Sequence, residues 1–99
     1  MAIIKIMRTV AGEDIIGEVI FETEQVLRVR NPCQIGFVMT PAGQPSINMQ
    51  RLLAFSSEDQ VDIRQPSLLY VTTVDIKIEM KYNEIFGNII IAQPKIITG

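Results

Sequence analysis

Residues 12–38, which read GEDIIGEVIFETEQVLRVRNPCQIGFV, constrain the fold more than any other part of the chain. Ile15, Gly17, Val19 and Phe21 recur at every second position of residues 13–21, and apolar and polar residues alternate again from Leu27 to Arg30 within residues 25–31. A period of two over such lengths is typical of half-buried strands. Residues 22–24 are polar and separate the two stretches, and residues 33–39 add a third. The pattern predicts a strongly bent antiparallel meander at the centre of a small β domain.

The register of the first hairpin follows from matching its two alternating stretches across a three-residue loop. The expected facing pairs are Phe21–Gln25, Val19–Leu27, Glu18–Arg28 and Gly17–Val29. Gly17 lies in mid-strand, where a glycine suits a sharp bend or a close backbone approach. Pro32 has no backbone donor, so we expect the ladder to break at Asn31-Pro32.

Short apolar stretches between Pro, Gly and polar residues predict the remaining strands. The expected strands are residues 2–9, 47–55, 61–64, 68–72 and 89–92, and the clearest loops are residues 40–46 and 56–60. Residues 93–99 are expected to form a tail. Together these elements predict a mostly β fold, a small and strongly bent antiparallel barrel or sandwich, with one helix near the C-terminus.

That helix is one of two interpretations of residues 74–82. The strict alternation of this segment is typical of a strand, whereas a helix also accounts for residues 85–87 and for the capping-box-like spacing of Thr72 and Asp75. We favour the helix. It would place Ile76 and Met80 on a second apolar side, away from the main stripe, and another subunit is the simplest cover for them.

A chain of 99 residues fits one domain, spanning residues 1–99. Its apolar residues, 47% of the total, are enough for a hydrophobic core. The net charge of −2 gives a single copy no basic field to attract nucleic acid, so such binding would need local clusters of cations. No apolar run is long enough to span a membrane, and the first residues lack the pattern of a signal peptide. With Cys33 as the single cysteine, we expect an intracellular, cytoplasmic protein.

The chain also lacks the residues that most catalytic sites need. It has no histidine, which excludes Ser-His and Cys-His nucleophiles and His-ligated metals. Cys33 lies on an expected strand without a basic neighbour, so we expect a buried, inert thiol. Glu13 and Asp14 would point to opposite faces of a strand. We therefore expect no enzymatic activity, no metal site and no cofactor.

Residues 9–35, TVAGEDIIGEVIFETEQVLRVRNPCQI, resemble the first Sm motif of Sm-like (LSm) proteins. The matching residues are the two glycines Gly12 and Gly17, the corner Phe21-Glu22 and the aliphatic residues Leu27 and Val29. The chain as a whole is similar to small Sm-like proteins encoded by phages of marine cyanobacteria. In these proteins, as at residues 82–87 here, a Tyr-x-x-x-Phe-Gly segment follows the strands.

The resemblance implies a highly bent, five-stranded Sm-like barrel. Sm-like subunits pair their edge strands into closed rings of five to seven copies, and the rings bind RNA. The RNA-contacting asparagine of the first motif falls near Gln25 or Val26 in this chain. In place of the Ile-Arg-Gly of the second motif, the chain has Ile85-Phe86-Gly87.

Five residues are therefore candidates for contacts with single-stranded RNA: Gln25, Arg28, Arg30, Phe86 and Asn88. Arg28 and Arg30 share a strand face, and in a ring of subunits they would form a continuous basic surface. Alternatively, this face is only solvated, and Arg28 pairs with Glu18. Phe86 would stack on a base that Asn88 contacts, or the two would lie in the core and in a helix-ending turn.

Two hypotheses of function follow. In the first, the chain is a homo-oligomeric Sm-like ring that binds single-stranded RNA as a chaperone or scaffold. In the second, it is a structural or assembly ring, as in a phage, that makes protein contacts alone. The acidic balance and the residues that replace the RNA-contacting positions favour the second hypothesis.

Overall fold

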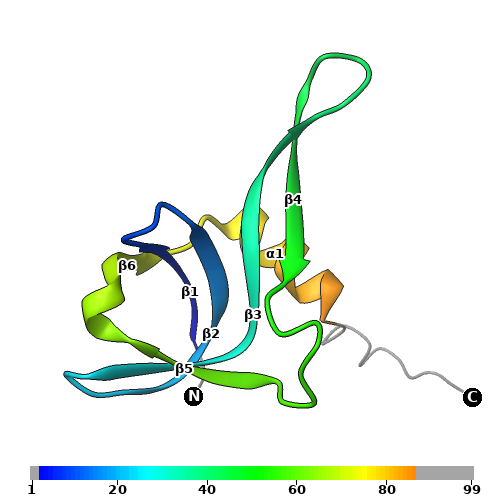
Figure 1. Ribbon diagram of the computed structural model, residues 1–99. Coiled ribbons are helices and arrows are strands. Elements are labelled where there is room, and N and C mark those ends of the chain that lie inside the picture. The colour runs from blue at the N-terminus through cyan, green and yellow to red at the C-terminus, as the bar shows by residue number, and fades with distance from the viewer. Residues whose placement is uncertain (1–2, 87–99) are drawn as a thin grey trace, which may run out of the picture.

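The computed structural model describes residues 3–86, which form one antiparallel sheet and a single helix (Figure 1). The strands are β1 (Ile3–Thr9), β2 (Asp14–Glu22), β3 (Val26–Met39), β4 (Pro45–Arg51), β5 (Gln60–Arg64) and β6 (Leu68–Thr73), and the helix is α1 (Ile76–Ile85). A short 3-10 helix, Gln65–Ser67, joins β5 to β6. Strands account for 57% of these residues, which confirms the prediction of a mostly β chain with one helix near its end.

The long strand β3 organises the sheet. Its first half pairs with β5 and its second half with β4, while β2 lies along its other side. The strand order is β4-β3-β2-β1-β6. Within residues 3–86 the sheet is not closed, because the end strands β4 and β6 do not pair with each other. A closed barrel is therefore not confirmed.

The bend of β3 lies at Asn31 and Pro32. Between two ladder pairs these residues oppose the single residue Gly17 of β2, which is the geometry of a β-bulge. Asn31 has a φ of 51°, in the left-handed region that asparagine tolerates better than most residues. A side chain at Gly17 would overlap Cγ1 of Val29, so only glycine lets the two strands approach here. The ladder is interrupted as predicted, but the strand itself continues through the bulge.

The predicted register of the β2–β3 hairpin is wrong. The observed facing pairs are Val19–Val29, Glu18–Arg30, Phe21–Arg28 and Glu22–Leu27. A second bulge at Ile20 inserts an extra residue into β2, and the turn is closed by a bond of 2.9 Å from the Thr23 N–H to the Val26 carbonyl oxygen. The error begins at the turn, which lies between Thr23 and Val26 and not at residues 22–24, so that Phe21 faces Arg28 in place of Gln25.

Apolar side chains form a core on each face of the sheet. One cluster comprises the buried residues Met7, Ile15, Leu27 and Val29, with Val19, Ile63 and Leu68 packed against them. The other, the helix-side core, comprises Ile16, Cys33, Val74 and Tyr82, with Ile4, Ile6, Ile35, Met49, Ile78 and Phe86 packed against them. Ile15 and Ile16 are adjacent on β2 and so point into different clusters. This is why β1, which lies between β2 and β6, is apolar on both faces.

The structure confirms the helical interpretation of residues 74–82, because α1 covers Ile76–Ile85. Helix α1 begins after Asp75, whose carboxylate accepts a bond of 3.4 Å from the Lys77 N–H as the N-cap. Thr72 lies in β6, so the capping box suggested by the sequence does not form. Ile76 and Met80 are 63% and 59% exposed, which confirms their predicted position on a second apolar side of the helix.

The hairpin formed by β3 and β4 projects beyond the rest of the molecule (Figure 1). Its turn contains Gly43 at a φ of 82°, a conformation that favours glycine. The predicted strand over residues 47–55 is too long, since β4 ends at Arg51 and the chain turns immediately after it. The predicted strand at residues 89–92, the tail at residues 93–99 and the candidate Asn88 lie outside the described residues.

Candidate RNA-binding strip and docking surfaces

Three arginines lie on the outward face of β3 and β5, and we refer to Arg28, Arg30 and Arg64 as the arginine strip. On β3 they alternate with Leu27 and Val29, which are buried, so the arginines point away from the core. Arg64 reaches this face because β5 pairs with β3, a contact between residues distant in sequence. The structure thus places Arg28 and Arg30 together, as predicted, and adds Arg64.

Arg28 is already engaged by a carboxylate. Its Nε and Nη2 atoms donate hydrogen bonds of 2.8 Å and 3.2 Å to the two carboxylate oxygens of Asp62. These bonds hold the pKa of Asp62 below its usual range and raise that of Arg28. The guanidinium carbon of Arg28 also lies 5.0 Å from the ring centroid of Phe21, a cation–π distance. The predicted partner of Arg28, Glu18, is therefore wrong.

Glu18 instead lies opposite Arg30, with 3.6 Å between the carboxylate oxygen and Nη1 of Arg30. Arg64 is exposed and forms no ion pair within residues 3–86. Two of the three charges of the arginine strip are thus balanced by carboxylates. A phosphate group would have to compete with Asp62 and Glu18 for them, although exposed pairs of this kind are individually weak.

Gln25 lies exposed in the β2–β3 turn, at the same end of the sheet as Arg64, since Arg64 faces the next residue, Val26. The Gln25 carbonyl oxygen accepts a bond of 2.9 Å from the Gln65 N–H. The Gln65 side-chain amide donates a bond of 3.2 Å to the Thr23 carbonyl oxygen. The 3-10 helix between β5 and β6 therefore holds this turn in place, while the side chain of Gln25 faces solvent.

Phe86 does not present a free ring for stacking. Its ring centroid lies 4.8 Å from that of Tyr82, and its side chain packs against the helix-side core. The guanidinium carbon of Arg51 lies 5.8 Å from the Phe86 ring centroid. The structure thus favours the alternative in which Phe86 belongs to the core. Phe21, which the sequence-based predictions did not select, is the exposed aromatic residue beside the arginine strip.

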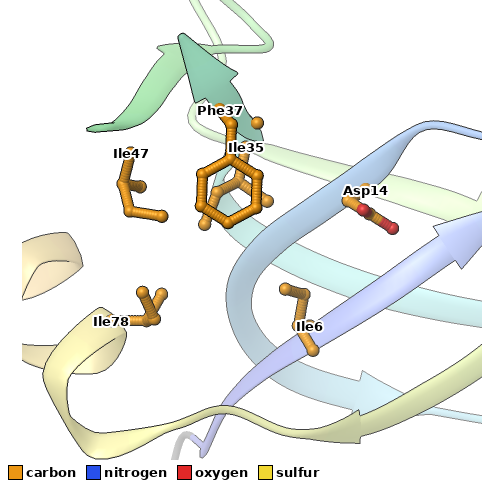
Figure 2. A pocket seen from close by; sticks show the side chains of 7 residues that line it. Ile6, Asp14, Ile35, Phe37, Ile47 and Ile78 are labelled. Carbon is orange, nitrogen blue, oxygen red and sulfur yellow. The ribbon is translucent and has the colours of Figure 1, made fainter. Parts of the chain in front are cut away.

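An apolar pocket of about 210 Å³ opens between the sheet, the base of the projecting hairpin and α1 (Figure 2). It is lined by Ile6, Asp14, Ile35, Gly36, Phe37, Ile47 and Ile78. Its one carboxylate, Asp14, accepts bonds of 2.8 Å and 2.9 Å from Nε and Nη2 of Arg8. With that carboxylate engaged by Arg8, the remaining lining is apolar, so the pocket suits an apolar group.

Apolar side chains also gather on surfaces that no part of residues 3–86 covers. On the projecting hairpin, Phe37 and Met39 are 75% and 68% exposed. On the end strand β6, Leu69, Tyr70 and Val71 are exposed. The sequence carries a signal for the hairpin, because residues 34–50 contain no charged residue. Exposed apolar side chains at a sheet edge are typical of surfaces that bind other chains.

No known protein family matches the chain, and a comparison with curated proteins found no relative. Within residues 3–86, no helix is long and apolar enough to cross a membrane. In the same residues, no three Cys, Asp or Glu side chains converge into a set that could hold a metal ion.

Proposed function

We propose that this chain is a non-catalytic Sm-like subunit that associates with copies of itself through its sheet edges and acts as a structural or assembly scaffold. One observation carries the proposal: within residues 3–86, β4 and β6 are the end strands, each with one unpaired edge, and β6 exposes Leu69, Tyr70 and Val71. A row of unpaired backbone donors and acceptors is a template for another strand. The strong bend of β3 also supports the proposal, because it fits an Sm-like barrel. In this proposal the open edges of the sheet pair between copies and not within one copy.

The two edges suit each other. β4 has seven residues and β6 has six, so one edge of a copy can pair with the other edge of the next over nearly its whole length. Pairing of this kind is head-to-tail, and it gives a closed ring when the rotation between copies closes. The resemblance to Sm-like proteins suggests five to seven copies, and its phage members suggest a role in phage structure or assembly.

Solution mass tests this proposal. Light scattering of the wild-type protein should give a single multiple of the 11.1 kDa chain. Leu69→Lys/Val71→Lys puts two charges on the β6 edge and should shift the mass to that of a monomer. Phe55→Lys is the control, since Phe55 is an exposed apolar residue that lies in the loop between β4 and β5. A monomeric wild-type protein would refute self-association.

A second function, binding of single-stranded RNA, is favoured by one specific arrangement. Phe21 is 48% exposed beside Arg28, and Arg64 on the same face has no carboxylate partner within residues 3–86. An aromatic ring of this kind can stack a base, and guanidinium groups on the same face can hold the phosphates. In a ring this arrangement would be repeated once per copy, so that weak contacts would add up.

Titration of a labelled oligo-uridine at low and moderate salt tests this second function. If the strip binds RNA, Arg28→Ala/Arg64→Ala should abolish binding, and Asp62→Asn should strengthen it severalfold by removing the carboxylate that competes with phosphate. Lys77→Ala/Lys81→Ala, which removes the same charge from α1, serves as the control. A ring that shows no binding at low salt leaves the scaffold function alone.

A further inference from the structure

The projecting hairpin, here called the arm, comprises residues 34–50. It contains no charged residue, yet its two strands pair continuously from Gln34–Gln50 to Met39–Pro45 and carry Phe37 and Met39 into solvent. Phe37 and Met39 are two apart on β3, so they share a face of the arm. A rigid, uncharged and apolar projection has little to offer a phosphate backbone and much to offer an apolar protein surface.

The chain also carries one surface of matching character. Ile76 and Met80 are four apart on α1, so they form a stripe on one side of the helix, and both are more than half exposed. The opposite side of the helix carries Ile78 and Tyr82 into the helix-side core, which leaves this stripe without a partner in residues 3–86. Only Val74 and Asp75 separate the helix from the end of β6.

The direction of strand pairing brings these two surfaces together in neighbouring copies. All pairs in this sheet are antiparallel. If β4 of one copy extends β6 of the next in the same way, Pro45 at the start of β4 lies near Thr73 at the end of β6. The arm continues from Pro45 beyond that end, toward the first turns of α1. Met39, which faces Pro45, lies at this end of the arm.

We propose that the arm of one copy packs on the Ile76–Met80 stripe of the next copy and so locks the assembly. This inference rests on the self-association proposed above. The partner is a second copy because each molecule supplies one arm and one stripe, both apolar and both uncovered within residues 3–86, at matching ends of two complementary edges. The contact removes two apolar surfaces from water at once, which edge pairing alone would leave exposed.

Disulfide trapping tests the contact. In a Cys33→Ala background, which has no other cysteine, Met39→Cys/Ile76→Cys should give a ladder of covalent species beyond the dimer under mild oxidation. Met39→Cys alone and Ile76→Cys alone should give no ladder, because a head-to-tail contact needs one cysteine from each surface. Phe55→Cys/Ile76→Cys is the control pair, with an even more exposed cysteine placed outside the arm.

Dilution gives a second measurement that does not depend on cysteine geometry. Phe37→Ser/Met39→Ser changes only exposed side chains, and it should raise the concentration at which the oligomer dissociates by at least tenfold, whereas Phe55→Ser should leave it unchanged. An oligomer that shows neither the ladder nor this shift overturns the arm contact but leaves edge pairing intact. A monomeric wild-type protein overturns both.

Discussion

The Tyr82 hydroxyl of α1 lies 2.8 Å from the Asn31 carbonyl oxygen, at the bulge where β3 bends. It is also 3.1 Å from the Arg30 carbonyl oxygen. Tyr82 is 2% exposed, so its hydroxyl has little access to water and finds its acceptors in these two carbonyl groups. Burial raises the pKa of Tyr82, which keeps the hydroxyl protonated and able to donate. The helix is thereby fixed to the most distorted point of the sheet.

We expect Tyr82→Phe to lower the free energy of unfolding by about 1–2 kcal/mol, because it removes the donor and keeps the ring. Urea denaturation followed by circular dichroism measures this difference. Tyr70→Phe, at an exposed tyrosine of β6, should change the free energy by less than about 0.5 kcal/mol. Equal effects of the two substitutions would show that the hydroxyl contact does not stabilise the bend.

Gly17 gives the second prediction. Gly17→Ala should destabilise the fold by about 1–3 kcal/mol, since the added methyl group would overlap Cγ1 of the buried Val29. Gly36→Ala is the matched control on β3, where nothing lies within 4 Å of the added atom. Urea midpoints of the two variants should therefore differ clearly.

A double-mutant cycle extends the test of this close approach. In the Val29→Ala background, where the space is open, Gly17→Ala should cost much less than it does in the wild-type protein. Additive effects would place the strain elsewhere, for example at the Arg30 carbonyl oxygen, which is 3.4 Å from the added atom.

The strands could be predicted from sequence because each is a local pattern. Residues 13–21 repeat apolar residues at every second position, and β2 covers Asp14–Glu22. A helix is favoured because Ile85 and Phe86 extend its apolar stripe beyond what a strand explains. The register could not be predicted, because the turn lies between Thr23 and Val26 rather than at residues 22–24, and the bulge at Ile20 then shifts the pairing again. Backbone distortions of this kind depend on contacts across the sheet.

The candidate site likewise has features that the sequence predicts and features that it does not. The shared face of Arg28 and Arg30 is local information, and the structure bears it out. The carboxylate that engages Arg28 is Asp62, thirty-four residues away, and it could be found only once β5 was known to pair with β3. The Sm resemblance predicts an RNA contact at Gln25 but none at Phe21. The exposure of Phe21 depends on the bulge at the end of β2.

The Arg8–Asp14 pair predicts how stability depends on acid. The hydrogen bonds from Arg8 hold the pKa of Asp14 below its usual value of 3.8. On acidification the carboxylate therefore takes up its proton in the unfolded chain at a higher pH than in the folded protein. The stabilisation is present above about pH 4 to 5 and is lost as the pH falls through the lower pKa of the folded state.

We expect urea midpoints measured between pH 7 and pH 2.5 to fall below about pH 4, and Asp14→Asn to flatten part of that fall. Asp59→Asn is a suitable control, because Asp59 is exposed and takes part in no ion pair within residues 3–86. If the pH profile of Asp14→Asn parallels that of the wild-type protein, the pair contributes nothing to the acid transition.

Cys33 gives a prediction in the alkaline range. The thiol is fully buried in the helix-side core, and burial raises its pKa from 9.0 to about 11, against a weaker opposing effect of Arg51. Above pH 9 the unfolded chain loses the thiol proton while the folded protein retains it. Stability should therefore decline as the pH rises from 9 toward 11, and Tyr82, whose pKa is also raised, adds to the decline in the same direction.

The reactivity of the same thiol reports on the integrity of the helix-side core. At pH 8 an aromatic disulfide reagent should modify native Cys33 only as fast as the core opens, at least a hundredfold more slowly than it modifies the protein in denaturing urea. A Cys33→Ala/Phe55→Cys variant, which moves the only thiol to the exposed loop between β4 and β5, should react at once without urea. Tyr82→Phe should accelerate labelling of Cys33, because loosening α1 from the bend of β3 uncovers this side of the sheet. Rapid labelling of Cys33 in the native wild-type protein would mean that α1 does not cover the sheet in solution.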